Sequence, residues 1–361
     1  MKKLFYLGVT LLLFCCAKEQ KIMVDISDDI IIPKNYVVHK ATSEIIIDGK
    51  ADEIDWKNAK FTTNFIDIEG VKTPKQQTNV KMLWDKNYLY IYAKLKEKHI
   101  WADIKKRDEV IFYNNDFEVF IDPSNDTYNY GEIEINALNT VWDLKLDKPY
   151  RFSGNADNSW NLNNLKSAVF MKGTLNDFSD EDDFWSLEIA IPLEPLVTLK
   201  NQPKNKPVDG EQWRINFSRV EWDFEIIDDK YARKKVNNTY LPEYNWVWSN
   251  QGAINMHIPE NWGYLQFSNK NASEHEVFKP KTSIISEQIT FALFRKINFG
   301  DLQFLKEKEI GFKTEFTSLT YNDVIVDASF IRTNSGFTLS TENKKKQKKY
   351  TIKEDGFIIR K

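Results

Sequence analysis

Residues 40–268 contain a succession of short segments in which apolar and polar residues alternate, and this pattern constrains the fold more than any other feature. In 79–84 and 213–217 every second residue is apolar, which places one face of an extended strand against a core and the other toward solvent. Turn-forming residues such as Asp48 and Gly49 separate these segments, and no long helical pattern interrupts them. The sequence therefore predicts a mainly β fold, an antiparallel β-sandwich of the jelly-roll or immunoglobulin-like kind.

The N-terminus carries an export signal. Two lysines at positions 2–3 precede an apolar run over 4–14, which is too short to cross a bilayer as a helix. The segment 13–17, Leu-Phe-Cys-Cys-Ala, resembles a bacterial lipobox, in which the lipidated cysteine becomes the mature N-terminus. We expect a lipoprotein signal peptide at 1–15 and lipidation of Cys16, with an ordinary signal peptide or a buried N-terminal strand as the alternatives. Acylation at two or more positions gives firm attachment, so we expect an exported protein anchored at the outer membrane or cell surface.

The rest of the chain divides by composition. Residues 16–40 are expected to form the lipidated cysteine and a polar tether, and 41–268 the sandwich. The polar stretch 269–282 contains Pro280 and is interpreted as a linker. From 283 to 361 a helical apolar spacing is followed by strand-like segments, which predicts a small C-terminal α+β extension. Its lysine run at 344–349 is expected to be a solvated turn, with contact to anionic lipid or polysaccharide as the alternative.

Several function classes find no support in the sequence. A formal net charge of −3 gives no reason to expect a nucleic-acid partner. The four histidines lie in no metal-binding spacing, and no GxSxG or P-loop motif occurs, so no catalytic centre is expected. Carboxylates on strands keep a glycoside hydrolase open as an alternative, since such enzymes need only two. The acidic run 180–183 is interpreted as a solvated loop or at best a calcium site.

Several motifs together resemble the family 9 carbohydrate-binding modules, in that family's order and spacing, over about residues 40–268. The segments that carry the resemblance are 79–92, 115–123, 132–136, 139–144, 148–150, 185–192, 245–248, 254–257 and 262–267. The resemblance implies a sandwich with a shallow slot for the end of a sugar chain. Members of the family also bind structural calcium through loop carboxylates and carbonyls, which makes structural calcium a possible cofactor here.

The resemblance also implies a set of ligand-binding residues. Two aromatic rings clamp a terminal sugar in the family, because sugar C–H faces pack on aromatic faces. Trp248 falls at one clamp position and Phe112 or Tyr113 at the other, which predicts that Trp248 and Tyr113 face each other across an open gap. The polar and neighbouring members of the expected set are Glu118, Glu134, Asn136 and Trp246.

Two points remain open at this stage. Glu134 stands on the strand where the family has an arginine, so it is expected to accept from sugar hydroxyls or to bind a cation. Trp248 is left open between the slot and the core, and for Trp246 and Trp142 packing in the core is the favoured interpretation. We expect carbohydrate binding that supports polysaccharide or oligosaccharide capture and catabolism, with a glycoside hydrolase or a structural lipoprotein without ligand as the alternatives.

Overall fold

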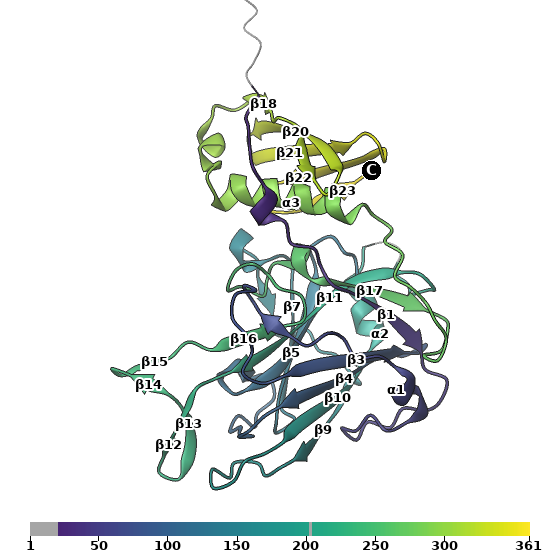
Figure 1. The fold of residues 1–361 in the computed structure, drawn as a ribbon, viewed down its shortest axis with the longest axis vertical. Helices are drawn as coiled ribbons and strands as arrows, with labels where there is room; N and C mark the ends of the chain where they lie inside the picture. The colour runs from purple at the N-terminus through teal and green to yellow at the C-terminus, as the bar shows by residue number, and fades with distance from the viewer. Residues whose placement is uncertain (1–20, 202–203) are drawn as a thin grey trace, which may run out of the picture.

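A computed structural model describes residues 21–201 and 204–361 (Figure 1). The predicted signal peptide and the lipidation site at Cys16 lie outside these residues. Within them, no helix is both long enough and apolar enough to cross a membrane.

In the described part of the chain, thirteen strands form one large sheet that curls into two facing layers. Its main path runs β8-β7-β6-β5-β11-β17-β1-β3-β4-β10-β9, and β16 and β2 pair beside β11. β1 is parallel to both of its neighbours, β17 and β3, whereas the central pairs β5–β6, β5–β11, β3–β4 and β4–β10 are antiparallel. The strands are β1 (Asn35–Lys40), β2 (Ile66–Asp67), β3 (Thr78–Trp84), β4 (Tyr88–Lys96), β5 (Asp116–Asp122), β6 (Tyr130–Asn136), β7 (Val141–Leu146), β8 (Ala156–Asp157), β9 (Lys166–Lys172), β10 (Phe184–Pro192), β11 (Gln212–Glu221), β16 (Tyr244–Val247) and β17 (Gly263–Ser268).

The apolar residues of the alternating segments fill the core between the two layers. In β5, Phe117, Val119 and Ile121 point inward, and they meet residues such as Ile91 of β4 and Ile189 of β10 in the main hydrophobic cluster. Because side chains alternate along a strand, the intervening residues of β5 must point to the opposite face. The predicted mainly β sandwich is confirmed, and its outward face is the one that carries the candidate site.

Shorter elements connect these strands. The helices are α1 (Ile54–Asn58) and α2 (Leu193–Thr198), with 3₁₀ turns η1 (Ser27–Asp29), η2 (Ile111–Tyr113), η3 (Tyr150–Phe152) and η4 (Pro259–Asn261). Two small hairpins project from the sandwich, as Figure 1 shows. They are formed by β12 (Phe224–Ile227) with β13 (Lys230–Arg233) and by β14 (Lys235–Val236) with β15 (Thr239–Tyr240).

The C-terminal unit is a helix packed on a small antiparallel sheet, as the helical spacing and the strand-like segments predict. The helix α3 (Ile284–Phe299) buries Ile289, Leu293 and Phe294 against Phe330 and Leu339. The lysine run forms the exposed turn between the second and third long strands of this sheet. The remaining elements are η5 (Gln303–Glu307), β18 (Lys313–Glu315), β19 (Leu319–Tyr321), β20 (Val324–Thr333), β21 (Gly336–Asn343), β22 (Lys348–Lys353) and β23 (Ile358–Arg360).

The expected polar tether at 16–40 is wrong for the part that the structure describes. The Ile22 backbone N–H donates to the Glu315 carbonyl at 3.0 Å, and Ile26 is buried in the core of the C-terminal unit. Residues 35–40 then form β1 inside the large sheet, so the sandwich begins before residue 41. Apolar residues at positions 22, 24 and 26 explain this, because they find partners in a unit that lies far away in the sequence.

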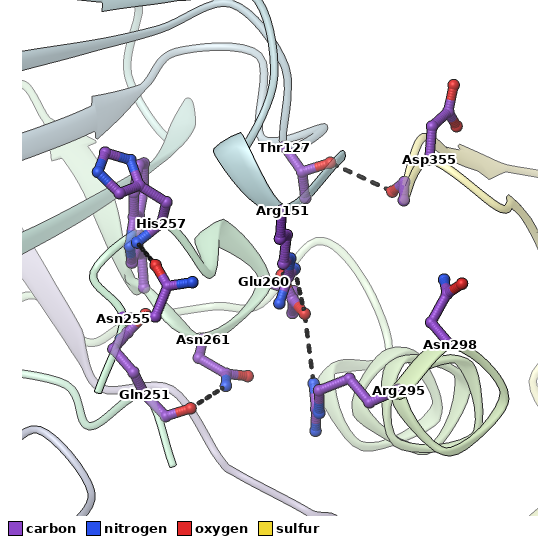
Figure 2. Close-up of polar contacts among 12 residues, drawn as sticks. Thr127, Arg151, Gln251, Asn255, His257, Glu260, Asn261, Arg295, Asn298 and Asp355 are labelled. Carbon is purple, nitrogen blue, oxygen red and sulfur yellow. Dashed lines mark hydrogen bonds and ion pairs between the residues drawn. The ribbon is translucent and has the colours of Figure 1, made fainter. Parts of the chain in front are cut away.

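Two buried carboxylates, each held by two arginines, join the C-terminal unit to the sandwich. Glu260 in η4 accepts two hydrogen bonds from Arg151, at 2.8 and 2.7 Å, and lies 3.5 Å from Arg295 of α3 (Figure 2). Glu287 of α3 accepts from Arg360 at 2.7 and 3.0 Å and lies 3.3 Å from Arg214 of β11. Each buried carboxylate therefore has positively charged partners, and in each set the partners come from both units.

Candidate functional site

A concave pocket lies on the outward face of the sheet portion formed by β7, β6, β5 and β11. It is open to solvent and encloses about 260 Å³. Loops before β5, after β7 and before η4 complete its wall. The lining residues are Ile68, Phe112, Glu118, Phe120, Glu132, Glu134, Trp142, Leu144, Tyr150, Val220, Glu243, Asn245, Ile254, Asn255, Met256 and His257.

The floor of the pocket is acidic because polar residues occupy the outward positions of two adjacent strands. Glu118 of β5 and Glu134 of β6 are direct cross-strand partners, and Glu132 lies one outward position further along β6. All three are buried, with 5%, 2% and 6% of their surface exposed. Burial raises the pKa of Glu118 to about 7. Burial and then the charge of Glu118 raise the pKa of both Glu132 and Glu134 well above the ordinary value.

Aromatic side chains form the sides of the pocket. Trp142 of β7 is partly buried, pairs in register with Glu134, and donates its indole N–H to the Asn158 carboxamide at 3.2 Å. Tyr150 is 48% exposed and packs edge-on against His257, with ring centroids 4.6 Å apart. Flat apolar faces beside carboxylate acceptors suit a sugar, which has apolar C–H faces and hydroxyl donors.

His257 supports this wall as a neutral imidazole. Its ring nitrogen lies 2.9 Å from the Tyr130 hydroxyl, and its backbone N–H donates to Asn255 at 2.8 Å (Figure 2). Burial, followed by the charge of Arg151, lowers the pKa of His257 to about 4. The pocket therefore gains no positive charge from this residue at neutral pH.

The structure brings together part of the predicted ligand-binding set. Phe112, Glu118 and Glu134 all line the pocket, and Glu134 also accepts from the Phe112 backbone N–H at 3.0 Å. Tyr113 lies next to Phe112 and is 45% exposed, but the Arg233 guanidinium covers its ring at 4.4 Å. Asn136 is fully buried, where its carboxamide binds the Ile104 carbonyl and the backbone N–H of Thr140, so it holds a turn and does not line the pocket.

The predicted gap between Trp248 and Tyr113 is wrong. Trp248 is 2% exposed and belongs to the main core, where its ring packs directly against Gly263. Trp246 is 1% exposed and donates its indole N–H to Glu221 at 2.6 Å. Both tryptophans pack between the layers, so neither presents a ring face to the pocket on the outward side.

Trp142 and Tyr150 are the aromatic residues that the sequence-based set omitted. Trp142 was expected in the core. Its side chain is only partly buried, because β7 lies near the edge of the large sheet. A signal was present, since segments 139–144, 148–150 and 254–257 are among those that resemble the family. The structure gathers Trp142, Tyr150 and His257, one from each of these segments, around a single pocket.

The acidic run 180–183 does not fit a calcium ion. Asp182 accepts hydrogen bonds from the backbone N–H groups of Ile100 and Thr174 at 2.7 and 2.6 Å, so its carboxylate holds two neighbouring chain segments in place. Asp183 pairs with Lys96 and Lys172, and Glu181 pairs with Lys98. Three of its four carboxylates, those of residues 181–183, are thus balanced by lysines or backbone donors.

A second cavity, of about 570 Å³, lies between the N-terminal segment and residues 272–278. Its lining includes Tyr36, His39, His275 and the edge of Trp248. Its lining residues at positions 35–37 and 39 belong to β1, whereas those at 32–34, 60–63 and 272–278 belong to connecting segments. Half of the residues that line the smaller pocket, including its acidic floor, lie on the strands β5, β6, β7, β11 and β16, which hold side chains more rigidly than connecting segments do.

Comparison with known proteins gives the class of this protein. Residues 47–236 match the family described as carbohydrate family 9 binding domain-like. That match includes ten of the pocket-lining residues, among them Glu118, Glu134 and Trp142, whereas of the second cavity it includes only residues 60–63. The chain belongs to this carbohydrate-binding family.

Two curated relatives are large enzymes that match over a short part of their length. Endo-1,4-beta-xylanase A of Thermoanaerobacterium saccharolyticum is 30% identical over 191 residues, which are 52% of this chain and 14% of the xylanase. Exoglucanase XynX of Acetivibrio thermocellus is 31% identical over 126 residues, 34% of this chain and 10% of the exoglucanase.

Solved structures with a similar chain path include two carbohydrate-binding proteins. A family 9 carbohydrate-binding module from Caldicellulosiruptor kristjanssonii, in complex with cellotriose, aligns with a TM-score of 0.43 and 15% identity, over 68% of this chain and all of that module. A putative carbohydrate-binding protein from Bacteroides uniformis aligns with a TM-score of 0.48 and 16% identity, over 65% of this chain and 99% of that protein.

Proposed function

We propose that this protein binds the end of an oligosaccharide or polysaccharide in the pocket formed by Glu118, Glu134, Trp142 and Tyr150, here called the acidic pocket. The observation that carries the proposal is the position of two aromatic side chains beside buried carboxylates, within a segment that matches a carbohydrate-binding family. Carboxylate oxygens accept hydrogen bonds from sugar hydroxyls, and an aromatic face takes the C–H face of the ring.

The Trp142→Ala variant tests this assignment. We expect the purified protein to retain a defined set of glycans on an array, and Trp142→Ala to weaken that binding at least about fivefold, since removing a stacked ring costs about 1–3 kcal/mol. The matched control is Trp160→Ala, because Trp160 is also partly buried but packs against the core outside the pocket. Equal losses in both variants, or none in Trp142→Ala, would rule out the acidic pocket as the binding site.

Hydrolysis of the bound glycan is the alternative function, and the same purified protein can test it. Two of the pocket carboxylates, Glu118 and Glu134, are direct cross-strand partners, and glycosidases use pairs of carboxylates. New reducing ends after incubation with the glycans retained on the array, lost in Glu118→Gln, would replace the binding-only proposal. We propose binding without cleavage.

We further propose that the protein is exported and lipid-anchored through Cys16, at the outer membrane or cell surface, and there supports glycan capture and catabolism. The basis is the lipobox-like segment 13–17 and the short apolar run before it. Cells expressing the Cys16→Ser variant should incorporate no labelled fatty acid into the protein and should release it from the membrane fraction. Membrane retention of that variant equal to the parent would reject the anchor.

A further inference from the structure

Two carboxylates that line the acidic pocket, Glu118 and Glu134, lie unusually close to each other and to the carboxylate of the neighbouring Asp116. Asp116 and Glu118 of β5 and Glu134 of β6 each offer an oxygen within 4.8 Å of the other two. They are 0%, 5% and 2% exposed, so water screens their mutual repulsion poorly. We refer to these three residues as the carboxylate triad.

Much of the hydrogen-bonding capacity of the triad is unused. Neither side-chain oxygen of Asp116 has a hydrogen-bond partner among the described residues, and the same holds for one oxygen of Glu118. A residue outside the triad adds to this observation, since Ser218 of β11 is the register partner of Glu118. Its hydroxyl is fully buried and lies close enough to Glu118 to lower the pKa of that carboxyl, but it makes no hydrogen bond within 3.5 Å in the described part of the chain. Buried polar atoms without partners are costly and call for a ligand that the protein itself does not supply.

The described residues supply no lysine or arginine in an ion pair with the triad. Among residues 21–201 and 204–361, neither lysine nor arginine lines the acidic pocket. The same chain treats its other buried carboxylates differently, because Glu260 and Glu287 each lie between two arginines. The positive charge that balances an ionised triad would therefore have to come from a bound ion.

We propose that the carboxylate triad, with the Ser218 hydroxyl, binds a divalent cation of the calcium type at the floor of the acidic pocket. Calcium prefers several carboxylate and neutral oxygen ligands in an adaptable geometry, which matches this set. Glu118 and Glu134 line the open pocket, so water or a bound ligand can complete the coordination from that side. Cation binding here goes beyond carbohydrate binding and does not depend on it.

The test measures the metal alone, without sugar. After removal of metal by EDTA, the purified protein is titrated with CaCl₂ at constant ionic strength, and both calcium uptake by equilibrium dialysis and thermal unfolding are followed. We expect one calcium per chain and a rise in the unfolding temperature, because a ligand that binds only the folded state stabilises it. An equal rise with KCl, or no uptake by the parent protein, would overturn the proposal.

Two conservative variants separate a cation site from a merely structural cluster. Glu134→Gln and Asp116→Asn should each lower calcium affinity at least tenfold. In EDTA both should unfold at a temperature equal to or above that of the parent, because each removes a buried carboxyl group that is costly to ionise without a partner. Glu181→Gln, in the lysine-paired acidic loop, is the control and should bind calcium as the parent does. Undiminished calcium binding by both triad variants would exclude this site.

Discussion

Replacing Glu287 by alanine is expected to lower the free energy of unfolding of the C-terminal unit by about 3–5 kcal/mol. Glu287 is fully buried in α3 and contacts Arg214 and Arg360. Although burial alone raises its pKa, Arg360 and then Arg214 hold the pKa of Glu287 below its ordinary value. Without this carboxylate, Arg214 remains buried at 2% exposure with its charge uncompensated.

Chemical denaturation followed by hydrogen exchange of the α3 amides measures this loss. The control is Glu315→Ala, because Glu315 pairs with Lys21 on the surface, where both side chains are more than half exposed. Such a pair contributes about 0–1 kcal/mol. If the two variants lose the same stability, the buried arginine–glutamate–arginine contact does not hold the C-terminal unit to the sandwich.

Replacing Gly263 by alanine is expected to destabilise the sandwich by about 3 kcal/mol, at the upper end of the cost of overpacking a core. A Cβ atom at this position would lie 2.2 Å from one carbon of the Trp248 ring and 2.7 Å from the next. Trp248 cannot move aside freely, because it packs within the main core against Phe217 at a centroid distance of 5.9 Å. Urea denaturation of the variant measures the effect.

A double variant identifies the cause of that loss. Trp248→Leu alone leaves a cavity and also destabilises the protein, but it removes the ring atoms that the new methyl group meets. Gly263→Ala combined with Trp248→Leu should therefore cost clearly less than the sum of the single changes. Strict additivity would show that Gly263 is required for a reason other than its approach to Trp248.

The sequence predicted the sandwich because its alternation has a direct physical cause. Residues such as Phe117, Val119 and Ile121 can share a buried face only if β5 is extended, and the same reasoning applies to each neighbouring strand. The C-terminal helix and strands were predicted for the same kind of reason, from a spacing that fits α3. By contrast, the contact of residues 22–26 with that unit joins distant segments, and no local pattern indicates such a contact.

The candidate site was predicted only in part, because alternation does not say which face of a strand is open. Glu118 and Glu134 were expected in the site, and their register as cross-strand partners puts both in the acidic pocket. Trp248 was expected at the site and Trp142 in the core, whereas the structure places Trp248 in the core and Trp142 in the lining of the pocket. Trp248 meets Gly263 in the core, whereas Trp142 lies near the sheet edge where a ring can remain accessible.

The location of a bound glycan tests the central claim most directly. A crystal structure of the protein with an oligosaccharide that it retains on the array should show a sugar ring against Trp142 or Tyr150, with its hydroxyls within hydrogen-bonding distance of Glu118 or Glu134. A sugar bound instead in the cavity beside Tyr36, His39 and His275, with the acidic pocket empty, would contradict the account.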